Sequence, residues 1–324
     1  MLYGTIQYVD KPVSRILFGT AISPLISGGD GSALLDTAFS LGINGLDTAR
    51  NYGLSEASIG NWLESRGNRE KVVLISKCAH PSMFGRKRVN ERDIRKDFKR
   101  STELMRTNHI DIYLLHRDDP DVPTGEVVEI LNAKHAEGKI GAFGGSNWTY
   151  IRIQQANEYA YAHNLIPFTV SSPNFSLAEQ VEDPWGGGCV TISGPDHGEA
   201  RAWYRRENMS VIAYSSLAHG LFSGRLKSSQ SENAASILDA AAIRGYAYPA
   251  NFERLRRCEE LAHAKRVSVP QIALRWLFAQ GLNAFAVVSA SCAERMRANI
   301  EALSLPMTQA EADYLDLKTE VCYE

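Results

Sequence analysis

The fold of this chain is indicated by residues 72–116, which read VVLISKCAHPSMFGRKRVNERDIRKDFKRSTELMRTNHIDIYLLH. This stretch starts with one apolar run, Val72–Lys77, and ends with another, Ile110–His116. Between the two runs, Glu91–Arg106 has the pattern of a helix. Continuous Val, Ile and Leu content, rather than strict alternation, is typical of parallel strands covered by helices. The stretch therefore predicts a strand, a helix and a second, parallel strand.

The same unit repeats about eight times along the chain. The other expected strands are Arg15–Thr20, Gly45–Ala49, Ile140–Ser146, Phe168–Ser172, Val211–Ser215 and Phe285–Ser289. The other expected helices are Ser32–Leu41, Glu56–Ser65, Thr124–Glu137, Thr149–His163, Glu199–Glu207 and Pro270–Ala279. Alternation of this kind predicts either a closed barrel or an open doubly wound sheet, and eight repeats favour the barrel. We expect an α/β fold of the (β/α)₈, or TIM-barrel, class in a single domain over residues 1–324.

Two segments stand outside the repeat. Tyr3–Val9 alternates well enough to be a strand of an N-terminal hairpin. Pro173–Asn208, after the sixth strand, is too long for an ordinary loop and carries Trp185 followed by three glycines. Loops after barrel strands lie at the catalytic face, so we expect this long loop to be a lid or a wall of the substrate site. The alternative is a tolerated surface insertion.

Composition excludes several classes of protein. Lys and Arg number 35 against 37 Asp and Glu, and the net charge of -2 gives no general attraction for nucleic acid. No apolar run approaches the roughly 18 residues that span a membrane, and Met1–Arg15 lacks the pattern of an export signal. The 5 cysteines form no CxxC pair, which argues against a disulfide framework and a thiolate metal site. We expect a cytoplasmic protein whose partner is a small molecule.

Four polar residues fall at or just beyond the ends of three consecutive strands. Asp47 ends the second strand, Tyr52 follows it, Lys77 ends the third and His116 ends the fourth. Each has another interpretation on its own, since Asp47 can be a turn residue, Lys77 can reach solvent and His116 can be a satisfied core histidine. Together they are hard to ascribe to packing, because buried charges need partners.

These four residues suit the reduction of a carbonyl group. A phenol has an ordinary pKa of about 10, and a nearby ammonium lowers that pKa by stabilising the phenolate. We expect Lys77 to act on Tyr52 in this way, with Asp47 holding Lys77. His116 then orients the substrate oxygen toward Tyr52, which donates the proton.

At this point the sequence resembles the aldo-keto reductase family. Gly45-Leu-Asp47-Thr-Ala-Arg-Asn-Tyr52-Gly53 is similar to the signature around the family's catalytic Asp and Tyr. Ile75-Ser-Lys77 and Tyr113-Leu-Leu-His116 match its lysine and histidine motifs. Motifs similar to those of its fifth and seventh strands occur at residues 138–148 and 213–224. The resemblance covers nearly the whole chain.

The resemblance implies a nicotinamide cofactor and the residues that bind it. Ser146 and Asn147 would bind the carboxamide, and Tyr214 would stack on the nicotinamide ring. Near the pyrophosphate and around the adenosine end, the implied residues are Ser216, Leu217, Gly220, Ser289, Ser291, Arg295 and Asn299. No GxGxxG fingerprint follows a first strand, which argues against a dehydrogenase of the Rossmann type.

The chain departs from the family's pattern at two of these positions. Ser172 stands where many members have Gln against the carboxamide, and Ser289 stands where some have Lys against the 2′-phosphate. Arg295 keeps a cation near that phosphate, so NADP(H) is favoured over NAD(H).

The mouth of the pocket is expected to draw on loops that hold mixed polar and aromatic side chains. These residues are His80, Phe84, Arg117, Asp118, Trp148, Asn174 and Trp185. A mixed surface suits a hydroxylated carbonyl, such as a sugar-like aldehyde, better than an apolar ketone. Trp148 has the alternative of packing the fifth helix against the barrel.

Two rival functions stay open. A barrel glycosidase would use Asp118 or Asp119 with Asp183 or another carboxylate, but it leaves the convergence of Tyr52, Lys77 and Asp47 unexplained. A nicotinamide-sensing subunit of the potassium-channel β-subunit type resembles the same family. The complete set of four residues favours catalysis over sensing alone.

Overall fold

A computed structural model describes residues 1–322 of the chain, and its strands form a closed parallel barrel. Around the barrel the order of the strands is β10-β3-β4-β5-β6-β7-β8-β9. Their bounds are β3 (Ile16–Gly19), β4 (Gly45–Asp47), β5 (Val73–Cys78), β6 (Ile110–Leu115), β7 (Ile140–Ser146), β8 (Val170–Ser172), β9 (Ser210–Ala213) and β10 (Asn283–Val288). The predicted (β/α)₈ barrel is confirmed, and each expected strand is present.

The seven expected helices are also present, each within a residue of its predicted ends. They are α1 (Ser32–Ser40), α2 (Ser55–Arg66), α3 (Glu91–Met105), α4 (Thr124–Ala136), α5 (Tyr150–Ala162), α6 (Gly198–Arg206) and α10 (Val269–Phe278). Within the described residues, five further α-helices were not predicted: α7 (Ala234–Ile237), α8 (Ala240–Tyr246), α9 (Pro249–Lys265), α11 (Ala293–Glu301) and α12 (Gln309–Leu315).

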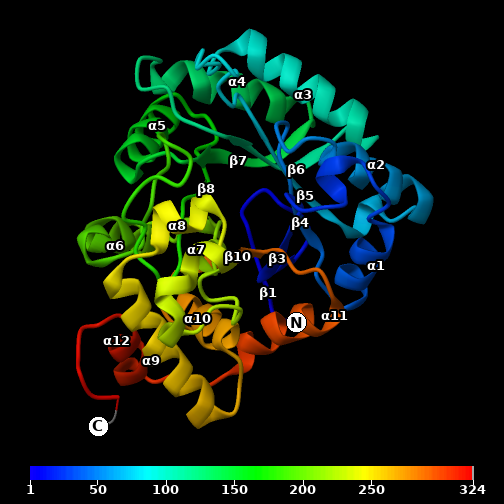
Figure 1. Ribbon diagram of the computed structural model, residues 1–324. Coiled ribbons are helices and arrows are strands. Elements are labelled where there is room, and N and C mark those ends of the chain that lie inside the picture. Colours follow the sequence, from blue (N-terminus) through cyan, green and yellow to red (C-terminus); the bar gives the residue numbers. More distant parts are fainter. Residues whose placement is uncertain (323–324) are drawn as a thin grey trace. The chain divides into compact units, whose positions relative to one another are not determined.

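The described residues divide into two compact units. One contains Leu2–Ser172 with Ser289–Ala293, and in it β4 to β8 run side by side with α2 to α5 outside them (Figure 1). All six residues of β5 and of β6 are buried, as expected for strands covered on both faces. The other unit contains Pro173–Val288 and the chain from Glu294 onward. The single domain over residues 1–324 stays a prediction.

The N-terminal hairpin is confirmed but is shorter than expected. Its strands are β1 (Tyr3–Gly4) and β2 (Val13–Ser14), which pair antiparallel. Only two residues of the predicted Tyr3–Val9 strand pair with β2, because the chain turns early and Tyr8 has a positive φ of 65°.

The long loop that precedes α6 is held by its own polar groups. The Asp183 carboxylate accepts hydrogen bonds from the backbone N–H of Trp185 at 2.8 Å and of Cys189 at 2.7 Å. Between these two residues, Gly186, Gly187 and Gly188 all have positive φ angles, which only glycine adopts easily. Across residues 1–322 no helix is long and apolar enough to cross a membrane.

Candidate active site

The four predicted catalytic residues lie at the carboxyl ends of neighbouring strands. Asp47 is the last residue of β4, Lys77 is the last residue but one of β5, and His116 follows β6 directly. The hydrogen bonding between β5 and β6 continues one residue past the end of β6, since the N–H of His116 donates to the carbonyl of Cys78 at 2.8 Å. Neighbouring parallel strands bring these side chains to one edge of the barrel.

Lys77 is the centre of this group. Its Nζ donates to Asp47 Oδ1 at 2.7 Å and to the carbonyl of Thr48 at 3.0 Å. The same Nζ lies 5.2 Å from the centre of the Tyr52 ring. These distances show that the phenol, the ammonium and the carboxylate converge as predicted. Both members of the Asp47–Lys77 ion pair are buried.

The loop that carries Tyr52 is fixed by a glycine and a buried glutamate. Gly53 has a φ of 53°, and a Cβ atom at this position would lie 2.5 Å from the carbonyl oxygen of Ile26. Glu56 is buried and accepts hydrogen bonds from Ser76 Oγ at 2.7 Å and from Arg50 Nη1 at 2.9 Å. The turn therefore requires glycine after Tyr52, and Glu56 ties the loop to β5.

The electrostatics of the site keep Tyr52 protonated. Burial raises the pKa of Tyr52 and outweighs the Lys77 ammonium, which acts to lower it. Burial alone would lower the pKa of Lys77, but the Asp47 carboxylate and Tyr52 more than offset this and raise it. The expectation that the pKa of Tyr52 is lowered is thus wrong. The described residues leave a neutral phenol beside a charged ammonium. The neutral phenol is the form of Tyr52 that can donate a proton.

His116 is not a satisfied core histidine. It is buried, and its Nδ1 has no hydrogen-bond partner within residues 1–322. Its ring meets the Tyr52 ring edge to face, with 5.6 Å between the ring centres. Burial lowers the pKa of His116 well below its usual value, so the imidazole is neutral. A neutral ring beside a phenol suits an uncharged, polar ligand atom.

The carboxylates needed for a glycosidase have other partners. Asp118 accepts from Arg152 at 3.0 Å, and Asp119 pairs with Lys87 at 2.7 Å. Asp183 is occupied by the backbone of the long loop. No cluster of metal-ligating side chains occurs in the part of the chain that the structure describes.

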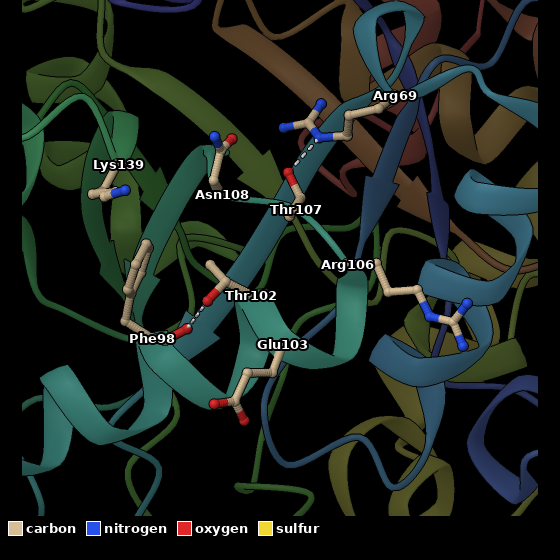
Figure 2. Close-up of a pocket in the computed structure, with 8 residues that line it drawn as sticks. All are labelled: Arg69, Phe98, Thr102, Glu103, Arg106, Thr107, Asn108 and Lys139. Carbon is tan, nitrogen blue, oxygen red and sulfur yellow. Dashed lines mark hydrogen bonds between the residues drawn. The ribbon is translucent and has the colours of Figure 1, made fainter.

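A surface hollow at the end of α3 is separate from this chemistry (Figure 2). Arg69 points into it but donates to Thr107 Oγ1 and to Asp111, beside the start of β6. Arg106 on the other wall pairs with Glu64. The residues that line the hollow include Arg69, Asn108 and Lys139, which precede β5, β6 and β7. The hollow thus lies at the amino ends of these strands, whereas barrel enzymes react at the carboxyl ends.

Comparison with known proteins now identifies the family. The family model of the aldo/keto reductases matches residues 15–320. The chain belongs to the aldo/keto reductase family. Its members are oxidoreductases that generally use a nicotinamide cofactor.

Several relatives are similar over most of this aldo/keto reductase. Protein tas of Escherichia coli is 24% identical to this chain, and the match covers 95% of each of the two chains. Norsolorinic acid reductase B of Dothistroma septosporum is 25% identical over 88% of this chain and 70% of its own. L-glyceraldehyde 3-phosphate reductase of Escherichia coli O157:H7 is 25% identical over 84% of this chain and 78% of its own.

The ends of β7 and β8 fit the carboxamide of a nicotinamide. Ser146 Oγ donates to the carbonyl of Ser172 at 2.9 Å, and Asn147 Nδ2 donates to the carbonyl of His116 at 3.2 Å. Ser172 Oγ is buried and has no partner among the described residues. Buried hydroxyls normally make hydrogen bonds, so the Ser172 hydroxyl marks a polar position beside the predicted Ser146 and Asn147.

The residues predicted after β9 lie in the other unit. Tyr214 is half-buried, and its ring centre lies 6.1 Å from that of Trp185 in the long loop. Ser216 is buried and donates to the carbonyl of Ala213 at 2.8 Å, while Leu217 precedes a short helical turn that Gly220 ends. Ser215 before this turn, and Ala218 and His219 within it, have left-handed backbone conformations. Strained non-glycine residues gather here, as they often do at ligand sites.

The residues predicted after β10 differ in exposure. Ser289 Oγ donates to the carbonyl of Gly19 at 2.8 Å, and Ser291 is exposed. Arg295 lies in the first turn of α11 and is exposed, and Asn299 on the same helix is buried. Arg295 makes no ion pair within residues 1–322, which leaves its guanidinium accessible to an anion.

Two residues expected at the pocket mouth are buried elsewhere. Trp148 is completely buried against Phe168, with 5.4 Å between ring centres, so its packing alternative is correct. Asn174 is completely buried and bonds to Tyr246 and Thr191. His80, by contrast, lies directly against His116, with 5.0 Å between ring centres.

Proposed function

We propose that this protein is an NADP(H)-dependent enzyme that transfers hydride between the cofactor and a small carbonyl or alcohol substrate, with Tyr52 as the proton donor for reduction. The observation that carries the proposal is the buried group of Asp47, Lys77, Tyr52 and His116 at the carboxyl ends of β4 to β6. Two of the relatives are named as reductases, which supports the same direction of reaction.

The cofactor, when bound, supplies the hydride that adds to the carbonyl carbon. As the carbonyl double bond opens, the Tyr52 hydroxyl gives its proton to the carbonyl oxygen, and an alcohol forms. Lys77 stabilises the resulting phenolate until a solvent proton restores it, and Asp47 holds Lys77 in place. His116, a neutral imidazole, hydrogen-bonds the carbonyl oxygen and aims it at Tyr52.

The proposed cofactor contacts follow the residues one by one. Ser146, Asn147 and Ser172 bind the carboxamide, and Tyr214 stacks on the ring. The other proposed contacts are Ser216, Leu217 and Gly220 to the pyrophosphate, and Ser289, Ser291, Arg295 and Asn299 to the adenosine end. Arg295 is the reason to propose NADP(H) rather than NAD(H), because a guanidinium pairs well with phosphate.

The location we propose is the cytoplasm. All 5 cysteines are free thiols, including the buried Cys78 and Cys258. Free thiols persist in a reducing compartment, which supports this location.

The test is a screen of purified protein with NADPH or NADH against aldehydes, ketones and keto-sugars. We expect the absorbance of reduced nicotinamide to fall when a carbonyl is added, and to fall faster with NADPH. Tight binding of NADPH without turnover of any carbonyl would favour a sensing subunit instead. Turnover of glycosides without any nicotinamide signal would overturn the proposal.

A further inference from the structure

His80 is a second imidazole beside the proposed site of carbonyl reduction. Its ring meets that of His116 edge to face at 5.0 Å, and His116 in turn meets Tyr52. We propose that His80 is a substrate-binding residue that accepts a hydrogen bond from a hydroxyl group on the carbon next to the carbonyl. The preferred substrates are then α-hydroxy aldehydes or ketones. This inference rests on the proposed function.

The backbone makes an unfavourable turn to bring His80 to this place. Ala79, which follows β5, has a φ of 57°, a left-handed conformation that costs free energy for any residue with a Cβ atom. Asn147, directly after β7, has the same conformation with a φ of 59°, and it is a proposed cofactor contact. A strained residue is kept where the surrounding structure holds it, often at a functional site.

An ion pair between the buried Asp97 and the partly buried Arg88 holds this turn. Asp97 on α3 accepts a hydrogen bond from the N–H of Ala79 at 2.9 Å and one from Arg88 Nη2 at 2.7 Å. Arg88 Nη1 also donates to the carbonyl of His80 at 3.2 Å. The backbone is thus held on both sides of the His80 Cα atom, which fixes the point from which the imidazole reaches the ring of His116.

The hydrogen bonds of His80 decide which atom that is. Nδ1 lies 2.9 Å from the carbonyl oxygen of Pro81, and because a carbonyl only accepts, Nδ1 carries the proton. Burial lowers the pKa of His80, so the ring is neutral near pH 7 and Nε2 is an acceptor. Within residues 1–322, Nε2 has no hydrogen-bond partner. The ring is only half-buried, so a ligand can reach it.

A hydrogen-bond acceptor beside the carbonyl site favours one class of substituent on the carbon next to the carbonyl. The carbonyl oxygen itself accepts hydrogen bonds, so it is matched by Tyr52 and His116 rather than by a lone pair on His80. A hydroxyl on the adjacent carbon can donate to Nε2, whereas a carboxylate there would place a negative oxygen against that lone pair. The geometry therefore favours hydroxy aldehydes over both their deoxy analogues and α-keto acids.

The experiment compares glyceraldehyde with propanal, which lacks the hydroxyl groups, in the full-length protein with saturating NADPH. His80→Leu is expected to lower kcat/KM for glyceraldehyde about tenfold, and for propanal less than about twofold. His80→Gln, whose amide oxygen accepts hydrogen bonds, is expected to recover most of the loss. His163→Leu, at an exposed histidine directly after α5, is the matched control and should change neither substrate.

NADPH affinity and Tm are measured on the same preparations. If His80→Leu does not fold, His80→Phe keeps a ring against His116 without the acceptor and gives the same comparison. Equal losses for glyceraldehyde and propanal, or no loss for either, would overturn the role of His80 while leaving the reductase intact. Wild-type protein that reduces neither aldehyde would overturn the proposed function, and the role of His80 with it.

Discussion

The Nζ atom of Lys77 lies 2.7 Å from Asp47 Oδ1, and the two side chains are only 3% and 5% exposed. Removing two charges from water is costly, and their attraction offsets that cost only when the geometry is good. Here the ammonium also donates to the carbonyl of Thr48. The pair is therefore better explained by what it does for Tyr52 than by a gain in stability.

This relationship predicts a separation of stability from activity. Asp47→Leu and Lys77→Met each leave one buried charge without its partner, so each should lower the free energy of unfolding by about 3–5 kcal/mol. The double variant removes both charges and should regain most of that loss while staying inactive. Urea unfolding and carbonyl turnover on the four proteins check this. A double variant as unstable as the singles would mean that the pair stabilises the fold in its own right.

The pH dependence of reduction follows from the two buried groups around the carbonyl. Tyr52 donates when protonated, and because burial raises its pKa, it stays protonated through the neutral range. Burial lowers the pKa of His116, so this ring does not gain a proton near pH 6. We expect kcat/KM for an uncharged aldehyde to be flat between about pH 6 and pH 9 and to fall only above that range. A titration with a midpoint near neutrality would contradict this assignment.

Arg295 is expected to set the preference between the two nicotinamide cofactors. Arg295→Ala should weaken NADPH binding by about 1.5–3 kcal/mol, the value of a charged hydrogen bond, and should barely change NADH binding. Arg297→Ala, an exposed arginine of the same helix, is the matched control. Equal weakening of both cofactors by Arg295→Ala would mean that the residue acts on α11 rather than on the 2′-phosphate.

The contacts of Trp185 change what this tryptophan is expected to do. Its ring meets Tyr214 at 6.1 Å and His219 at 5.7 Å, so it supports the residue proposed to stack on the nicotinamide. Trp185→Ala should weaken NADPH binding about two- to tenfold, the value of one aromatic pair, and Trp185→Phe should retain most of the affinity. The ring is 48% exposed, so Tm should change little. Unchanged NADPH affinity with a loss confined to large substrates would instead support the predicted substrate lid.

The strands and the first helices were predictable because their signals are local. Val73–Cys78 and Ile110–Leu115 are continuous apolar runs, and parallel strands covered on both sides need such runs. The longest helix, α9 (Pro249–Lys265), was missed although Pro249 is a good first residue of a helix. Its buried face includes Arg254 and Arg257, whose charges hide the apolar pattern. Arg257 is satisfied there by the carbonyl of Tyr314 and by Glu253, partners that only the fold supplies.

In the candidate site, too, some features were predictable from the sequence and others depended on the fold. The order of Asp47, Tyr52, Lys77 and His116 along the strands was enough to predict that they meet. The direction of the Tyr52 pKa was not predictable, because it depends on how deeply the phenol is buried. The contact between His80 and His116 was not predictable from the sequence either. It depends on the left-handed conformation of Ala79 and on the hydrogen bond from the Ala79 N–H to Asp97.

The central claim is that Tyr52 donates the proton, and Tyr52→Phe tests it most directly. This change removes one oxygen and leaves the ring that packs against His116. Turnover of the best carbonyl with saturating NADPH should fall by at least about 10²-fold, the usual loss for a missing general acid, while the Kd for NADPH stays nearly unchanged. Turnover by Tyr52→Phe close to that of the wild-type protein would contradict the account and remove Tyr52 from the mechanism.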